Sequence, residues 1–223
     1  MRTHAALVLC FFCFNGFVEA EQWQSLFNGK DLTGWHPVGG PAENWSANDG
    51  VLACNGKPGA QWLATDKQYD DFELALEFNV PENGNSGVFI RAPKQGAPYV
   101  KGLEIQVLDD YGEKWKGLKP AQFTGAIYAV AAPSQRATKK AGQWQKMLIH
   151  CVGRRVQVSI NDQMVVDANL DDFSEAAKRV TGLNRTSGHI GLQNHGDQIS
   201  YRNIRLRTVA ATAKSGRKTN GGQ

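Results

Sequence analysis

This sequence of 223 residues has no long apolar run and only four cysteines. No stretch approaches the ~18 to 20 apolar residues of a membrane-spanning helix, so we expect no insertion of the mature chain into a membrane. Phosphate-binding glycine loops, the G-x-S-x-G nucleophile elbow and the H-E-x-x-H zinc motif are also absent. The sequence therefore gives no evidence for nucleotide binding, serine-hydrolase chemistry or a zinc protease.

The chain also lacks a large excess of charge of either sign. The chain has 25 Lys and Arg residues against 21 Asp and Glu residues, and part of that excess lies in the last 16 residues, 208–223. This segment has no aromatic and few branched apolar residues, so we expect a disordered basic tail. Because the remaining chain is nearly balanced, a basic nucleic-acid-binding face is not supported.

The first 20 residues have the pattern of a secretory signal peptide. Arg2 and His4 precede an apolar run over 5–14, and small residues near Ala20 suit a cleavage site. We therefore expect residues 1–20 to be removed and the mature protein to be exported, to the periplasm or the extracellular space.

Removal of that segment leaves two cysteines, Cys54 and Cys151. An oxidising compartment permits a disulfide between them, and two buried free thiols on neighbouring strands is the alternative that we favour. Two cysteines are too few for a cysteine-based zinc site.

Residues 21–207 predict one domain built as an all-β sandwich. Apolar and polar residues alternate with period two in many short segments separated by Gly, Asn, Asp and Pro, namely 72–78, 88–91, 103–108, 147–152, 156–160 and 199–206. Asn161-Asp162 lies where a tight hairpin turn is expected. Helical periodicity is limited to one short segment, 171–180.

Alternation along these strands predicts a polar face. In the segment 102–108, Glu104 and Gln106 point away from the apolar set, roughly 7 Å apart at Cα. The same parity sends further polar side chains to the non-core side of other strands: Arg91, Tyr128, Gln193 and His195. Amides, a carboxylate and an aromatic ring suit a polyhydroxylated ligand, and an ordinary solvated sheet face is the alternative.

Two other features can each be interpreted in two ways. Asp109-Asp110, followed by Glu113, could bind a structural calcium ion, although an acidic turn after a strand accounts for the pattern more simply. No other metal or cofactor is expected. The tryptophans, Trp62 among them, could line a sugar cleft or serve as core and edge packing.

Several motifs, in order, resemble the 3-keto-disaccharide hydrolase domain family. They cover about 23–207 and comprise the opening LFNGKDLTGW (26–35), NSGVFIR (85–91), GLEIQVLD (102–109), TGAIY (124–128) and GLQNHG (191–196) followed by YRNI (201–204). Asn194 stands where the family commonly has Asp. The resemblance implies a concanavalin A-like jelly roll of two antiparallel sheets, with ligands on the concave one.

The resemblance also implies chemistry on glycosides oxidised to a ketone at sugar carbon 3. The ketone acidifies the hydrogen on carbon 2, so a base can form an enolate that expels the glycosidic oxygen, and water then adds back. Glu104 and His195 can divide the base and acid roles, and Arg91 or Tyr128 can hold the negative oxygen. Gln106, Gln193 and Asp109 complete the expected substrate-binding set.

We therefore expect an enzyme whose partner is an oligosaccharide or glycoside. The alternatives are a non-catalytic carbohydrate-binding module and a conventional endo-glycanase. A glycanase would pair Glu104 with Asp109, but their odd separation puts them on opposite faces of a regular strand.

Overall fold

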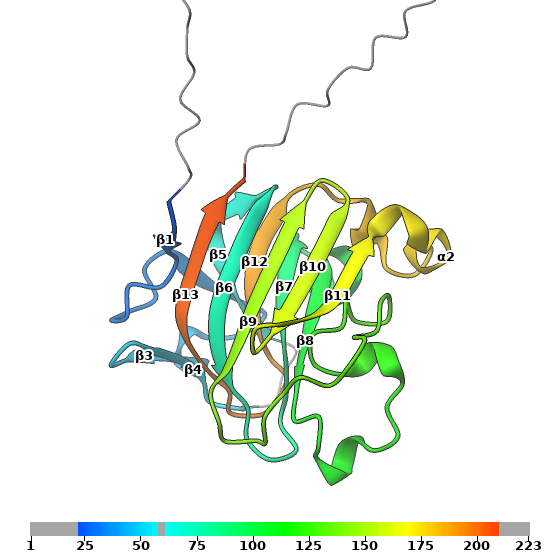
Figure 1. Ribbon diagram of the computed structural model, residues 1–223. Helices are drawn as coiled ribbons and strands as arrows, with labels where there is room; N and C mark the ends of the chain where they lie inside the picture. The colour runs from blue at the N-terminus through cyan, green and yellow to red at the C-terminus, as the bar shows by residue number, and fades with distance from the viewer. Residues whose placement is uncertain (1–21, 58–60, 210–223) are drawn as a thin grey trace, which may run out of the picture.

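The computed structural model describes residues 22–57 and 61–209, which form two antiparallel β-sheets packed face to face (Figure 1). The expected signal peptide, 1–20, lies outside the described residues, and so does the expected tail from residue 210 onward. The last strand continues to Thr208, and the Val209 N–H donates to the carbonyl of Asp71. No helix within the described ranges is long and apolar enough to cross a membrane.

The large sheet has eight strands in the order β11-β10-β9-β6-β13-β4-β3, with β1 paired to β13. These strands are β1 (Gln24–Ser25), β3 (Trp45–Asn48), β4 (Val51–Cys54), β6 (Phe72–Asn79), β9 (Gln145–Val152), β10 (Arg155–Ile160), β11 (Gln163–Asn169) and β13 (Ser200–Thr208).

The small sheet has five strands in the order β2-β5-β12-β7-β8. They are β2 (Trp35–Val38), β5 (Gln61–Tyr69), β7 (Asn85–Ala92), β8 (Leu103–Leu108) and β12 (Gly188–Asn194). Because every strand pair is antiparallel and the sheets pack by their apolar faces, the expected all-β sandwich is confirmed.

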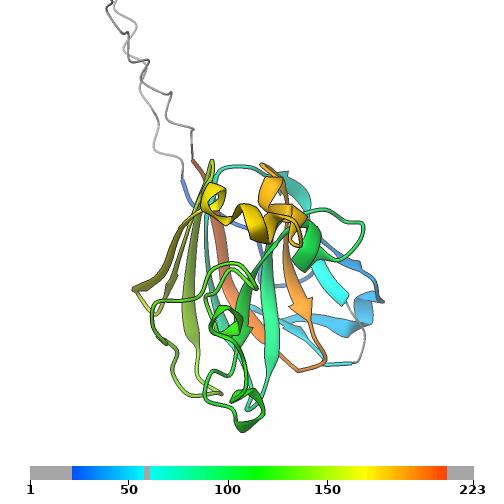
Figure 2. The same ribbon diagram turned by 90° about the vertical axis from the view of Figure 1, so that its right-hand side faces the viewer.

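Helical structure is limited to short segments, several of which gather at one end of the sandwich (Figure 2). The α-helices are α1 (Pro98–Lys101) and α2 (Ser174–Ala177), and the 3-10 helices are Ala42–Asn44, Glu113–Trp115, Pro120–Gln122, Leu170–Phe173 and Thr181–Asn184. The helical segment expected over 171–180 is confirmed as a 3-10 turn followed by α2.

The core lies between the sheets and follows the predicted alternation. Strand β6 alternates buried and half-buried residues from Phe72 to Asn79, and its fully buried members include Phe72, Leu74 and Phe78. The predicted hairpin is also present, since Asn161 and Asp162 have φ values of 48° and 67° between β10 and β11.

Cys54 and Cys151 are both buried free thiols, as favoured from the sequence, but the expectation that they lie on neighbouring strands is wrong. Cys54 ends β4 and Cys151 lies in β9, and β13 and β6 lie between these strands. Three strand spacings of about 4.8 Å separate β4 from β9, which is well beyond the Cα separation that a disulfide spans.

The prediction that Arg91 faces the polar side of its sheet is wrong. Between β12 and β7 the register shifts, so that His189 pairs with Ala92 but Gly191 pairs with Phe89. Strand β7 thus carries an extra residue at this point, and Arg91 adopts a φ of 50°. A β-bulge of this kind re-aims the side chain, and simple alternation does not anticipate it.

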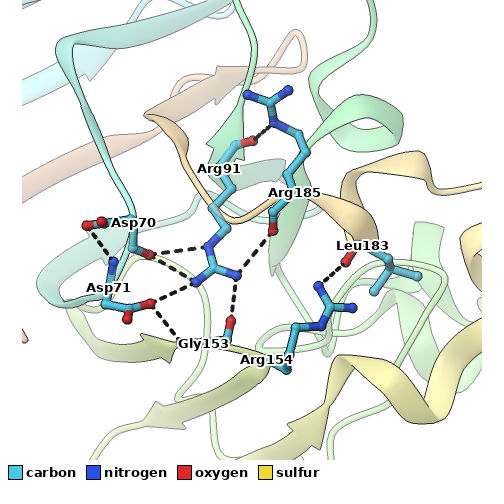
Figure 3. Close-up of polar contacts among 7 residues, drawn as sticks. All are labelled: Asp70, Asp71, Arg91, Gly153, Arg154, Leu183 and Arg185. Atoms are coloured by element: carbon cyan, nitrogen blue, oxygen red, sulfur yellow. Dashed lines mark hydrogen bonds and ion pairs between the residues drawn. The ribbon is translucent and has the colours of Figure 1, made fainter. Parts of the chain in front are cut away.

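The re-aimed Arg91 side chain is fully buried and joins three loops at one end of the sandwich (Figure 3). Its guanidinium donates to the carbonyls of Asp70 (3.0 Å), Gly153 (2.8 Å) and Arg185 (3.3 Å), and it contacts the Asp71 carboxylate at 3.2 Å. Arg185 in turn donates to the Arg91 carbonyl at 2.8 Å. Arg91 therefore has a structural role and is removed from the set of expected substrate-binding residues.

Substitution of Arg91 by Met should destabilise the fold strongly. The change leaves buried carbonyls without the donor that they share and removes the ion pair of the Asp71 carboxylate, a loss of about 3 to 5 kcal/mol, which corresponds to about 10 °C in Tm. The matched control is Arg155→Met, because Arg155 is 60% exposed and pairs with Asp167 at the surface, where water screens the pair and its loss should change stability little. Equal Tm changes in the two variants would contradict this role for Arg91.

Candidate functional site

A groove of about 1060 Å³ lies on the outer face of the small sheet. Five of the residues selected from sequence line it, which confirms their predicted face: Glu104, Gln106, Tyr128, Gln193 and His195. The remaining polar or aromatic lining residues that matter below are Gln61, Trp62, Asn85, Phe89, Lys94 and Tyr99.

Large side chains in the groove floor lie over glycines of neighbouring strands. A Cβ at Gly87 would come within 2.3 Å of the Glu104 carboxyl, and one at Gly191 within 2.2 Å of the Trp62 ring. The missing side chains therefore make room for Glu104 and Trp62 to lie down on the sheet. Trp62 then meets Phe89 edge to face, with ring centroids 5.6 Å apart.

Glu104 is a carboxyl group in an environment that disfavours its charge. Glu104 is only 5% exposed, although its side chain points away from the core between the sheets. Burial raises the pKa of Glu104 to about 8, and the neighbouring Gln193 side chain offsets only part of that increase. The carboxyl is therefore mostly protonated at neutral pH, and it can give a proton to a bound molecule.

Two amide oxygens in the groove lack partners among the described residues. They are Oε1 of Gln106, a residue only 3% exposed, and Oε1 of Gln193. The Gln106 amide is oriented by its nitrogen, which donates to Asn85 Oδ1 at 2.9 Å. Buried acceptors without donors cost free energy, so these oxygens are suited to accept hydrogen bonds from ligand hydroxyls.

Tyr128 reaches the groove through a segment that runs along the edge strand β8. Its backbone N–H donates to the Glu104 carbonyl at 2.9 Å, and Gln106 N–H donates to the Ala126 carbonyl at 3.0 Å. Gln122 donates to the Tyr128 phenol oxygen at 3.1 Å. That oxygen acts as the acceptor, so the phenol's own proton is free to be donated into the groove.

His195 lies on the exposed rim of the groove, directly after β12. Its neighbour Asn194 is fully buried, with its Oδ1 accepting from Gly196 N–H at 3.1 Å. The residue at which the chain departs from the family pattern therefore shapes the turn that presents His195.

The expectation that Asp109 binds substrate is wrong, because its carboxylate is used inside the fold. It accepts hydrogen bonds from the N–H groups of Asn83 (2.9 Å) and Tyr111 (3.3 Å) in the turn after β8. Asp110 accepts in the same way from Thr124 N–H and Thr138 Oγ1, both at 2.9 Å. The acidic pair thus organises the chain after β8, and no cluster of three metal-ligating side chains occurs within 22–57 and 61–209.

Some groove residues were not selected from sequence. Gln61, Asn85, Lys94 and Tyr99 come from strand ends and from the segment after β7, where alternation gives no information. The sequence allowed Trp62 a role either in a sugar cleft or in packing. It has both roles, since it lines the groove and is only 3% exposed.

A β-sandwich with a buried carboxyl and unpaired amide oxygens in one sheet-face groove fits the class of carbohydrate-active proteins. Within that class, the chain belongs to the family of 3-keto-alpha-glucoside-1,2-lyase-like domains, whose family model matches residues 22–207.

Relatives agree with this assignment. A 3-keto-disaccharide hydrolase of Bacteroides thetaiotaomicron is 26% identical over 86% of this chain and 80% of its own. A candidate glycosyl hydrolase of Parabacteroides distasonis superposes with a TM-score of 0.74 and 32% identity, over 84% of this chain and 100% of the other. The carbohydrate-binding module CBM66 of Bacillus subtilis shares the fold, with a TM-score of 0.56 and 15% identity, over 80% and 98% of the two chains.

Substitution of Glu104 by Gln should change stability in a pH-dependent way. The carboxyl ionises near 4.5 in the unfolded chain and near 8 in the folded protein, so between these values only the unfolded state has released the proton. The free energy of unfolding of the wild type must therefore fall as pH rises, relative to the variant, by up to about 1.4 kcal/mol per pH unit.

Urea unfolding at pH 5 and pH 8 measures this effect directly. The stability of Glu104→Gln relative to wild type should increase by roughly 3 kcal/mol between the two pH values. A difference that does not depend on pH would show that the Glu104 carboxyl titrates normally in the folded protein.

Proposed function

We propose that this protein cleaves glycosides whose sugar carries a ketone at carbon 3, by elimination followed by hydration. The family assignment and the relative named 3-keto-disaccharide hydrolase support this proposal. The buried carboxyl of Glu104 beside unpaired amide oxygens in one groove is the single observation that carries it.

The ketone makes the proposed elimination chemically accessible. A base removes the proton from carbon 2, and the electron pair is delocalised onto the oxygen at carbon 3. As that enolate collapses, a double bond forms between carbons 1 and 2 and the glycosidic bond at carbon 1 breaks. The leaving oxygen takes a proton, and water can then add across the new double bond.

Glu104 suits the role of the acid that protonates the leaving oxygen. A group with a pKa near 8 holds its proton at neutral pH and yet is acidic enough to give it to an alkoxide. In the proposed cycle Glu104 becomes an anion only after this transfer. It regains a proton from the water that adds to carbon 1, while His195 returns its proton to carbon 2.

His195 and Tyr128 take the two remaining roles in the proposal. A neutral imidazole nitrogen can accept the carbon 2 proton, and His195 lines the groove from its rim. Tyr128, whose oxygen already accepts from Gln122, donates its own proton toward the enolate oxygen. With Arg91 removed from the groove, Tyr128 is the candidate that remains for this role.

Gln106 and Gln193 bind the substrate in this scheme. Their free Oε1 atoms accept hydrogen bonds from sugar hydroxyls, which fixes the ring relative to Glu104. We also propose that the mature protein acts outside the cytoplasm, on the basis of the signal-peptide pattern over 1–20.

Hydrolysis by paired carboxylates is disfavoured by the groove itself. Glu104 is the one Asp or Glu among the described lining residues, and Asp109 is engaged in the turn after β8. A retaining or inverting glycosidase needs a second carboxylate across the scissile bond.

Turnover of 3-keto-disaccharides beside their unoxidised parents tests the proposal. We expect products from the keto-sugars only, and a loss of roughly a hundred-fold or more in kcat for Glu104→Gln and for His195→Ala. Calorimetric binding of the same keto-sugars should survive in Glu104→Gln, since the amide keeps the shape of the carboxyl.

Two results would count against the scheme. Near-normal turnover in both variants would reject the assigned residues. Binding of every keto-sugar by the wild type without any product would favour a binding module over an enzyme.

A further inference from the structure

The outer face of the large sheet carries a second depression, of about 490 Å³, on the opposite side of the sandwich from the groove. Its floor is a row of residues that pair across neighbouring strands. The strand registers align Arg205 of β13, Ala75 of β6, Leu148 of β9, Ser159 of β10 and Met164 of β11, and all of these but Met164 line the depression. We call this row and its flanks the outer trough.

The outer trough is long and has an apolar, shallow floor. The residues of its row that line the depression lie on four neighbouring strands, so the depression extends over three strand spacings, or about 14 Å. Leu148 and Met164 are 38% and 54% exposed, whereas Ala75 and Ser159 are too small to fill the space between the flanking rows. An exposed apolar strip between polar walls is a feature of ligand-binding surfaces.

The walls of the outer trough consist of charged side chains that already neutralise one another. On one side, Glu77 accepts from Arg202 and Asn203, both at 2.8 Å, and Lys146 pairs with Asp162 at 3.2 Å. These contacts hold planar carboxylate and amide groups in place along the apolar floor.

The row of side chains on the other side lies outside the depression itself and is paired in the same way. Glu73 contacts His150 at 3.0 Å and also accepts from Arg207. Because both walls pair acids with bases, the outer trough offers many hydrogen-bonding groups but little net charge for a charged partner.

Trp23 closes one end of the outer trough. It is 37% exposed, and the guanidinium groups of Arg205 and Arg207 lie 5.6 and 5.0 Å from its ring centroid. Guanidinium contacts orient the indole while part of its surface stays accessible. An oriented and partly exposed indole can pack against the C–H face of a sugar ring.

We propose that the outer trough binds a neutral oligosaccharide chain, independently of the groove on the small sheet. Sugar rings present C–H faces to Trp23 and Leu148, and their hydroxyls bond the fixed groups of the walls. The length of the row suits an extended chain of several sugar units. Such a site would hold the protein on a glycan while the groove acts on a small glycoside.

The composition of the face favours a sugar over a second copy of the chain. A stable protein interface buries about 800 Å² on each partner around an apolar centre, and three exposed apolar side chains along one row provide much less than that. The paired charges also leave no strong single-sign patch to attract a charged macromolecule.

Calorimetric titration of the wild type with cellohexaose, xylohexaose and mannohexaose tests this proposal. We expect binding of at least one of these neutral chains. Trp23→Ala, which removes the indole, and Ala75→Phe, which fills the floor, should each weaken that binding by about tenfold or more.

Three controls show whether binding takes place in the outer trough. Tyr111→Ala removes an aromatic side chain that is 52% exposed and lines neither depression, and it should leave binding unchanged. Glu104→Gln should also leave hexaose binding unchanged, because Glu104 lies in the groove. Turnover of a small 3-keto-disaccharide should be the same in Trp23→Ala, Ala75→Phe and wild type.

Several results would overturn the proposal. They are no binding of any of the three hexaoses, binding that survives both trough variants, and binding lost in Glu104→Gln. A concentration-dependent dimer in sedimentation that Ala75→Phe dissociates would identify a second copy as the occupant. None of these outcomes depends on whether the groove turns over keto-sugars, so failure of one proposal leaves the other testable.

Discussion

A permanently charged side chain with no access to water must have every donor satisfied, and Arg91 imposes that requirement on one end of the sandwich. Carbonyls from three separate loops and the Asp71 carboxylate meet its guanidinium. This can occur only because β7 bulges there and turns the side chain out of the regular alternation. The loop contacts, the register between β7 and β12 and the face that Phe89 presents to the groove are therefore linked to one another.

Below the bulge, the same sheet holds a group of opposite character. No cation of 22–57 or 61–209 contributes to the pKa of Glu104, and its environment favours the neutral carboxyl. The absence of side chains at Gly87 and Gly191 is what allows Glu104 and Trp62 to lie on the sheet at this depth. The small sheet thus holds two buried polar side chains with different roles. Arg91 has a full set of partners and is structural, whereas Glu104 lacks a charged partner among the described residues and is the group suited to chemistry.

Strand alternation predicted the fold and most of the groove from sequence, since period two is a property of regular strands. It located Glu104 and Gln106 correctly because β8 is regular from Leu103 to Leu108. It failed at Arg91 because a bulge adds one residue. The expectation for Asp109 came from the resemblance and not from alternation, which places Asp109 on the opposite face from Glu104, and its carboxylate is bonded in the turn after β8. The bulge at Arg91 cannot be predicted from the residues around it. The burial of Glu104 depends on glycines in other strands, which no local pattern reveals.

The two outer faces of the sandwich have different chemical characters, one with a proton donor in a deep groove and one with balanced charges around a shallow strip. The central claim concerns the first: that the Glu104 carboxyl stays neutral at physiological pH because it is buried without a cation. Carbon-13 NMR titration of side-chain carboxyls in glutamate-labelled protein, with Glu104→Gln to assign the signal, tests it most directly. The account predicts a Glu104 midpoint near 8, and a midpoint close to the ordinary glutamate value of about 4.3 would contradict it.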